Sequence, residues 1–351
     1  MQIQRRLLYA IHTIVAGAML AISGGAATQA ADYHLVKKIV LGGEGGWDYF
    51  KADPVTHRVF IARGSHMMVL DPEGKVLQDV TGLKGSHAVD LAPDLKRIFT
   101  SNGSANSVSM LDQDTLRIIA EVKIRNRDTD AILYEPISKR VFTFNGEGGN
   151  DATAIDAKTG DVLGSIPLGG KPEFAQTDNS GRVFVNMEDL SQIKEIDPKG
   201  LKVRNTWPIA PCKEPSGMAI DVAHKRLFSG CHNGITTVVD YDTGKVVASF
   251  PIGQGVDANQ FDPGTALVFA SCGDGTITVA HQDSPDTYTV VQKIATQAGA
   301  RTMALDTGNH NIYTVTADRG PTPPPTTDNP RPRPTLVPGT FTLLIFSHQA
   351  K

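Results

Sequence analysis

Short apolar segments separated by polar turns run through the chain from residue 33 onward, and no stretch has the apolar spacing of an amphipathic helix. A strand-like pattern that ends in an aromatic residue recurs seven times, first as Arg58-Val59-Phe60 and last as Asn311-Ile312-Tyr313. The aromatic residues lie 39 to 44 positions apart, at Phe60, Phe99, Phe142, Phe184, Phe228, Phe269 and Tyr313. An acid often stands seven positions earlier, where a tight turn between strands is expected, at Asp53, Glu135, Asp221, Asp262 and Asp306.

Each repeat of about 42 residues holds four short strands, which is the pattern of a propeller blade. The sequence therefore predicts an all-β, seven-bladed β-propeller over residues 31–351, with four-stranded antiparallel blades. Residues 33–41 form a strand without a repeat of its own, and the last repeat, around residues 341–346, lacks an outer strand. We expect the N-terminal strand to close the ring in the last blade, because closure removes the open sheet edges.

One segment of the last repeat, residues 321–338, breaks the pattern because it is rich in proline and threonine. Polyproline geometry favours an extended surface loop inserted into the last blade, which is the interpretation we adopt. The alternative is a docking tail or a flap over the mouth of the central channel.

The N-terminus resembles a secretory signal peptide. Arg5 and Arg6 precede an apolar stretch over residues 7–22, and small residues end at Ala30. We therefore expect a signal peptide over residues 1–30, cleaved near Ala30, and export to the periplasm. Removing two arginines and no acid changes the formal net charge from −3 to −5. This acidic balance argues against nucleic-acid binding, and no further apolar stretch is long enough to span a membrane.

A polar ring is expected at the channel mouth. The innermost strand of each repeat begins about twelve residues before the aromatic, and those positions converge on one mouth of a propeller. The ring residues are Asp48, His87, Asp130, Glu173, Ser216, Asp257 and Arg301. Three interpretations remain open: a wet channel without a ligand, a site for a hard cation such as calcium, and a pocket for a small anionic or sugar-like molecule.

The three cysteines allow two arrangements. Cys212 and Cys231 lie in loops on the same side of the fifth repeat, so a disulfide between them is the favoured hypothesis for an oxidising compartment. Cys272 would then remain free. The alternative is a soft-metal cluster of Cys231, Cys272 and His232, although this spacing matches no common zinc motif.

The repeats resemble the YVTN-repeat, YncE-like family of bacterial periplasmic propellers. The family motif, an aromatic residue followed three positions later by asparagine, appears at residues 99–102 and 142–145 and more loosely at 313–316. The characteristic turn is present over residues 240–246. The resemblance implies the propeller fold and export, and it implies no particular reaction.

A functional interpretation follows from these features. The chain has no haem-attachment motif, nucleophile elbow, zinc-protease motif or phosphate-binding loop. We therefore expect a periplasmic module that binds a small molecule or a periplasmic protein. The alternative is a metal-dependent hydrolase of the lactonase type. Similarity to gluconolactonase-like propellers implies a divalent ion for that enzyme, held by Glu173, Asn102, Asn145 and Asp257.

Overall fold

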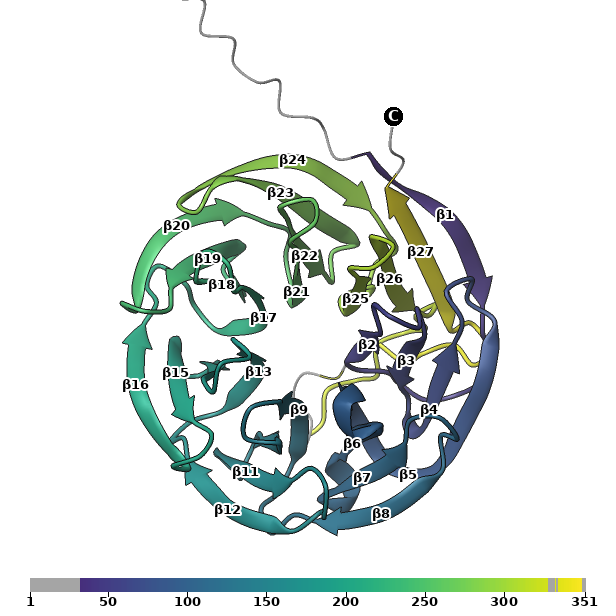
Figure 1. The fold of residues 1–351 in the computed structure, drawn as a ribbon. Helices are drawn as coiled ribbons and strands as arrows, with labels where there is room; N and C mark the ends of the chain where they lie inside the picture. The colour runs from purple at the N-terminus through teal and green to yellow at the C-terminus, as the bar shows by residue number, and fades with distance from the viewer. Residues whose placement is uncertain (1–31, 328–331, 333, 349–351) are drawn as a thin grey trace, which may run out of the picture.

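Antiparallel sheets follow one another around a ring in the computed structural model of the protein (Figure 1). The structure describes residues 32–327, 332 and 334–348, so the predicted signal peptide over residues 1–30 lies outside the described residues. The described strands form six sheets, of which five have four strands and one has seven. Strands β8, β12, β16, β20, β24 and β1 follow the rim of the ring in Figure 1, and strands β2, β9, β13, β17, β21 and β25 lie near its centre.

Four of the four-stranded sheets are each formed by four consecutive strands. Their strands are β9 (Thr129–Glu135), β10 (Arg140–Asn145), β11 (Asp151–Asp156), β12 (Val162–Pro167); β13 (Pro172–Thr177), β14 (Val183–Met187), β15 (Gln192–Asp197), β16 (Lys202–Pro208); β17 (Pro215–Asp221), β18 (Arg226–Cys231), β19 (Ile235–Asp240), β20 (Lys245–Pro251); and β21 (Val256–Asp262), β22 (Leu267–Cys272), β23 (Thr276–Ser284), β24 (Thr287–Ala295).

The seven-stranded sheet contains one long strand, β5, whose two halves pair with different strands. Its strands are β2 (Phe50–Ala52), β3 (Val59–Ala62), β4 (Gly64–Leu70), β5 (Val76–Ala92), β6 (Arg97–Asn102), β7 (Ser107–Asp112) and β8 (Ile118–Lys123). The first part of β5 pairs with β4, and its last part, from Ser86 to Ala92, pairs with β6. Short 3-10 helices, η1 (Pro93–Leu95) and η2 (Gly103–Ala105), flank β6. Within the described residues, no helix is long and apolar enough to cross a membrane.

The N-terminal strand completes the last sheet, as the sequence predicts. Strand β1 (Tyr33–Val40) pairs antiparallel with β27 (Thr342–His348), outside β26 (Asn311–Thr316) and β25 (Met303–Asp306). The register pairs Tyr33 with His348 and Val40 with Thr342. The first and last strands of the described chain are therefore hydrogen-bonded neighbours at the rim (Figure 1).

The hydrophobic core lies between neighbouring sheets. All seven repeated aromatic residues are fully buried, each on the second strand of its repeat. One core cluster, for example, combines Phe269 of β22 with Leu305 of β25 and Phe346 of β27. Burying a side chain of this size contributes about 1.5–3 kcal/mol relative to leaving it exposed. The repeat in the sequence therefore corresponds to one layer of hydrophobic packing between neighbouring sheets.

The proline-rich segment forms the connection between β26 and β27. Its described ends pair with each other, since Gly320 N–H donates to the carbonyl of Thr335 at 2.8 Å and Val337 N–H to that of Asp318 at 2.9 Å. Residues 321–327 are exposed, as expected for a surface loop. Gly339 N–H donates to the carbonyl of Gly43, so the connection is attached to the segment that precedes β2.

Candidate ligand-binding site at the channel mouth

The predicted ring residues occupy matching places in their repeats. Four of them are the second residue of an innermost strand, namely Asp130 of β9, Glu173 of β13, Ser216 of β17 and Asp257 of β21. In each of these strands, the register with the next strand shifts at that residue. The register of β5 with β6 shifts around His87 as well. A bulge changes the direction of a side chain, which explains how polar side chains can leave the blade and face the channel.

A cavity of about 620 Å³ opens at this mouth, and six of the seven ring residues line it. His87 is the exception, but it contacts two residues that do. The structure therefore brings the ring together. The lining also includes Lys171, Glu188, His232, Arg319 and Tyr49.

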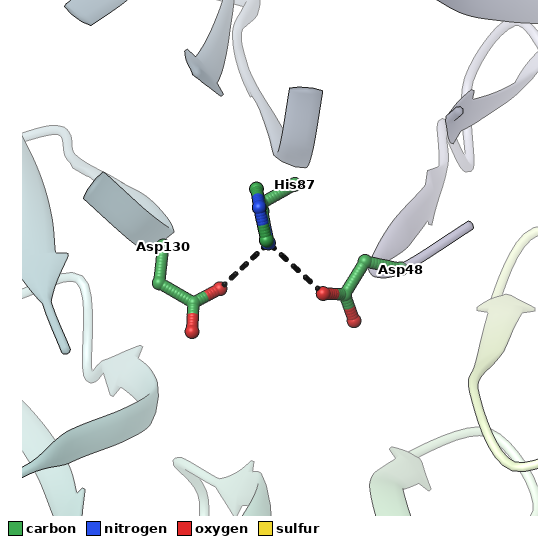
Figure 2. A group of neighbouring side chains, drawn as sticks. All are labelled: Asp48, His87 and Asp130. Atoms are coloured by element: carbon green, nitrogen blue, oxygen red, sulfur yellow. Dashed lines mark hydrogen bonds and ion pairs between the residues drawn. The ribbon is translucent and has the colours of Figure 1, made fainter. Parts of the chain in front are cut away.

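On one wall of the cavity, His87 lies between two carboxylates (Figure 2). Its Nδ1 is 3.1 Å from Oδ2 of Asp48 and 3.5 Å from Oδ1 of Asp130. Interaction with Asp130 and then Asp48 raises the pKa of His87 to about 10, although burial acts in the opposite direction. Burial raises the pKa of Asp130, and the nearby charge of Asp48 raises it further. The wall thus holds one positive imidazole between two acids.

The second wall is built around Glu173. Its Oε1 accepts from Nζ of Lys171 at 2.7 Å, and its Oε2 accepts from the hydroxyl of Tyr49 at 3.2 Å. Lys171 also pairs with Glu188. Burial, followed by the charge of Asp130, raises the pKa of Glu173 to about 8, even though Lys171 opposes the shift. Close to neutral pH, Glu173 can therefore gain or lose a proton.

The third wall contains the pair of Asp257 and Arg301. The guanidinium donates from one terminal nitrogen to Oδ1 of Asp257 at 2.9 Å. Burial raises the pKa of Asp257 to about 6, while Arg301 counteracts the shift. Burial opposes the charge of Arg301, but the neighbouring acids, Asp257 first, hold its pKa above the usual value. Arginine at the mouth thus stays charged and can bind an anionic group.

Two of the predicted metal ligands, Asn102 and Asn145, do not line the cavity, so the structure does not bring the set of Glu173, Asn102, Asn145 and Asp257 together there. The amide of Asn102 donates to Ser109 at 2.8 Å within its own sheet. The amide of Asn145 donates to Asp151 at 2.8 Å and to Thr153 at 3.0 Å. Both side chains are buried in blade hydrogen bonding, which leaves only Glu173 and Asp257 at the mouth.

The cysteines adopt the favoured arrangement. Cys212 and Cys231 form a disulfide, and Cys272 is a buried free thiol. The alternative soft-metal cluster is therefore not formed, because the sulfur of Cys231 is bonded to Cys212. The disulfide lies near the start of β17, since Cys231 pairs in register with Pro215.

Among the lining residues that were not identified from the sequence, three have polar side chains of functional interest. Tyr49 follows Asp48 directly, Lys171 stands two positions before Glu173, and Arg319 belongs to the connection after β26. None of them has a counterpart at the same position in the other repeats, so periodicity could not find them. The only available signal is the cluster of charge in residues 171–173.

Comparisons with known proteins show the fold. No family model matches the chain, and no curated protein matches it. Among solved structures, the chain is similar to a chain in the crystal structure of a mitotic checkpoint complex, with a TM-score of 0.72 at 11% sequence identity. The match covers 98% of this chain and 98% of that chain. Together with the ring of sheets, this likeness identifies an all-β propeller (Figure 1).

Proposed function

We propose that this protein is a periplasmic binding module of the YVTN-repeat, YncE-like type, built as a seven-bladed propeller. The blade count is supported by β5, which pairs with β4 along one part and with β6 along another. Counting β5 in both halves divides the seven-stranded sheet into two four-stranded blades. With the five four-stranded sheets, each of the seven sequence repeats then has a blade.

The proposed ligand is a small, hydroxyl-rich molecule with an acidic group, bound at the channel mouth. One observation carries this proposal: side chains of both charges, from separate sheets, converge on one cavity of about 620 Å³. Arg301 and Lys171 supply cationic donors for the acidic group, and the carboxylates of Asp48 and Asp257 are acceptors for hydroxyl groups. A cavity of this size suits a sugar acid.

Two other functions have less support. The solved neighbour comes from a protein complex, which agrees with a protein-binding role, but no described surface of this chain indicates a particular protein. The lactonase alternative needed the amide oxygens of Asn102 and Asn145 as metal ligands at the mouth, and both side chains are buried in their sheets and do not line the cavity. Binding of a small molecule is therefore the function that we propose.

The proposal is tested by measuring the melting temperature of the purified protein with sugar acids and with the matching neutral sugars. Sugar acids are expected to raise it, and the effect should be lost in Arg301→Gln. Arg204→Gln is the matched control, because Arg204 pairs with Asp197 away from the mouth. If no sugar acid shifts the melting temperature and calorimetry detects no heat, the proposed ligand class is wrong.

Export is tested separately. Amino-terminal sequencing of the protein expressed in a Gram-negative host should begin near Ala31, and the protein should appear in the periplasmic fraction. An intact N-terminus in the cytoplasm would contradict the proposed location.

A further inference from the structure

We propose that Asp48, His87 and Asp130 form a binding site for a divalent transition-metal ion of the zinc class, on one wall of the cavity. This inference deepens the proposed binding function and rests on it, because the metal would lie within the same mouth. It shares no residue with the lactonase-type set of Glu173, Asn102, Asn145 and Asp257, and it differs in the class of ion from the calcium-type site considered for the whole ring.

The geometry of the three side chains suits a single ion. They come from separate stretches of the chain: the residue pair before β2, the body of β5 and the start of β9. One ligand atom from each residue lies within 4.8 Å of the other two. Ligands that each lie about 2.0–2.2 Å from a zinc ion can be no more than about 4.4 Å apart, so small rotations of the carboxylates would close the site. Figure 2 shows both carboxylates directed at the imidazole.

The hydrogen bonding of this cluster is incomplete, which is the second observation. Oδ1 of Asp130 is buried and accepts no hydrogen bond from the described residues; its ion-pair partner, Nδ1 of His87, is 3.5 Å away and lies closer to Asp48. Nearly all buried polar atoms in proteins have a hydrogen-bond partner, and an exception calls for an explanation, of which a bound ion is one. The one nitrogen of His87 between the acids can donate a single hydrogen and cannot fully serve both carboxylates. A dication would bind both.

The imidazole is also held in place. A Cβ atom added to Gly103 would lie only 2.9 Å from Nε2 of His87, so the backbone of η2 packs directly against the ring. The main-chain carbonyl of His87 accepts from the N–H of Tyr49 at 3.0 Å, which ties β5 to the segment that carries Asp48. A ligand set that is oriented before the ion arrives loses less entropy on binding.

The chemistry of the ligands selects the ion. Calcium and magnesium prefer oxygen ligands alone, whereas imidazole favours zinc and its neighbours in the transition series. The ion would displace the proton that the imidazole holds between its two acids and release it to solvent, and two carboxylates with a neutral imidazole then balance the charge of a dication. Three protein ligands leave a coordination position open to the cavity, as in zinc sites that bind a further molecule. The hydroxyl or acidic group of the proposed ligand is suited to that position.

Other histidine–aspartate pairs in the described chain lack this arrangement. His310 contacts Asp262 at 2.6 Å, and His57 contacts Asp306 at 2.7 Å. Each pair offers a single acid, and each acid already accepts a backbone N–H, from Gly264 and Gly308 respectively. These pairs therefore provide the matched control for metal binding by a histidine beside an aspartate.

The test is a calorimetric titration of zinc chloride into untagged, chelator-treated protein without any organic ligand. We expect one zinc ion per chain, with affinity lowered at least a hundredfold in Asp130→Asn and in His87→Gln. His310→Gln should bind zinc as the wild type does. Circular dichroism checks that each variant is folded. If a variant does not fold, cobalt substitution of the wild type decides, because one nitrogen and two carboxylate ligands give a visible absorption band.

Three results would overturn the inference: no stoichiometric zinc, equal affinity in the folded mouth variants, or loss of binding in His310→Gln alone. The sugar-acid measurement is made separately, so the two proposals can fail independently. Zinc binding without any effect of sugar acids would retain the metal site and reject the ligand class. An effect of sugar acids without zinc binding would do the reverse.

Discussion

The innermost strands carry acidic residues at both ends, and the two groups have opposite surroundings. At the far end, Asp53, Asp262 and Asp306 are buried at the turn that leads to the second strand. At the channel mouth, Asp48, Asp130 and Asp257 begin the same layer of strands. Both groups consist of aspartate side chains that are at least partly buried. They differ in how many hydrogen bonds their carboxylates accept.

The turn acids are fully engaged. Asp306 accepts from Gly308 N–H at 2.9 Å and contacts His57 at 2.7 Å. Asp53 accepts from Val55 N–H at 3.0 Å and from the hydroxyl of Thr56 at 2.6 Å. These interactions fix the turn and, through His57, join neighbouring sheets. The acids at this end therefore have a structural role.

The mouth acids are incompletely engaged. One buried oxygen each of Asp130 and Asp257 accepts no hydrogen bond from the residues that the structure describes. The pKa values of both side chains are raised, chiefly by burial. Such an arrangement costs folding free energy, so its presence points to a ligand rather than to a structural need. Burial alone does not distinguish a structural acid from a ligand-binding acid. The number of hydrogen bonds that the carboxylate accepts does distinguish them.

The largest expected effect is the loss of a turn acid. Asp306→Ala should lower the free energy of unfolding by about 3–5 kcal/mol, because it removes two hydrogen bonds to a carboxylate, one from Gly308 N–H that fixes the turn and one from His57 that joins neighbouring sheets. Asp130→Asn should lower it little or raise it, since one crowded charge is removed. Urea denaturation of both variants measures the difference. Equal losses would break the comparison between the two ends.

The disulfide should have the next largest effect. It joins residues 19 positions apart, and its removal in the Cys212→Ser, Cys231→Ser double variant should cost about 3 kcal/mol. Because the bridge lies at the mouth end of β17 and β18, hydrogen exchange should increase around Ser216 before it increases around Asp221. Uniform exchange along both strands would show that the bridge does not act locally.

The pH dependence of stability should arise at the mouth. Burial raises the pKa of Glu173 to about 8 in the folded protein, from its ordinary value of about 4.5, so the folded state prefers the protonated acid. Stability is then greatest below pH 4.5 for this group and decreases as the pH rises through 8. In Glu173→Gln, the free energy of unfolding should decrease between low and high pH by on the order of 2 kcal/mol less than in the wild type. The difference is smaller than the full pKa shift of Glu173 would give, because Glu173 titrates together with Lys171 and Asp130. Denaturation at pH 5 and pH 9 measures it, and identical profiles would contradict the assignment.

The smallest effect is expected from Gly103→Ala. The new methyl group would meet Nε2 of His87 at 2.9 Å and should displace the ring, at a cost of about 1 kcal/mol. Zinc affinity should fall more than stability, since the ligand is moved from its acids. Gly148→Ala is a steric control with no neighbour near its added atom, although its own backbone conformation adds strain. A stability loss in Gly103→Ala without any change in zinc affinity would argue against the metal site.

Much of the fold can be predicted from the sequence, because the same four-strand unit with one buried aromatic residue repeats along the chain. The spacing of Phe60, Phe99 and the later aromatics gives the number of residues from one core layer to the next. Counting back from each aromatic residue leads to the ring residues, six of which line the cavity at the mouth. Spacing tells at which end of a strand a residue lies. It does not tell whether the side chain faces the channel or the neighbouring strand.

The predicted metal ligands show why the direction of a side chain matters. Asn102 and Asn145 are at the mouth end of β6 and β10, but their amides hydrogen-bond to adjacent strands. The register shifts that direct Asp130 and Asp257 inward involve local pairing, which leaves no pattern in the sequence. Lys171 and Arg319 occur in single repeats, so only the folded ring reveals that they belong to the mouth.

The pairing of β1 with β27 has a consequence for the order of folding. The first strand of the described chain, β1, can acquire its partner only after β27 has been synthesised, more than 300 residues later. Until then, the exposed apolar side chains of Leu35, Val36 and Val40 lie on a strand without a neighbour, which is a template for association with other chains. Contacts between such distant residues form slowly, so joining the sheets into a ring is expected to be the late step. A nascent chain of this protein is therefore most vulnerable in the interval before its final strand arrives.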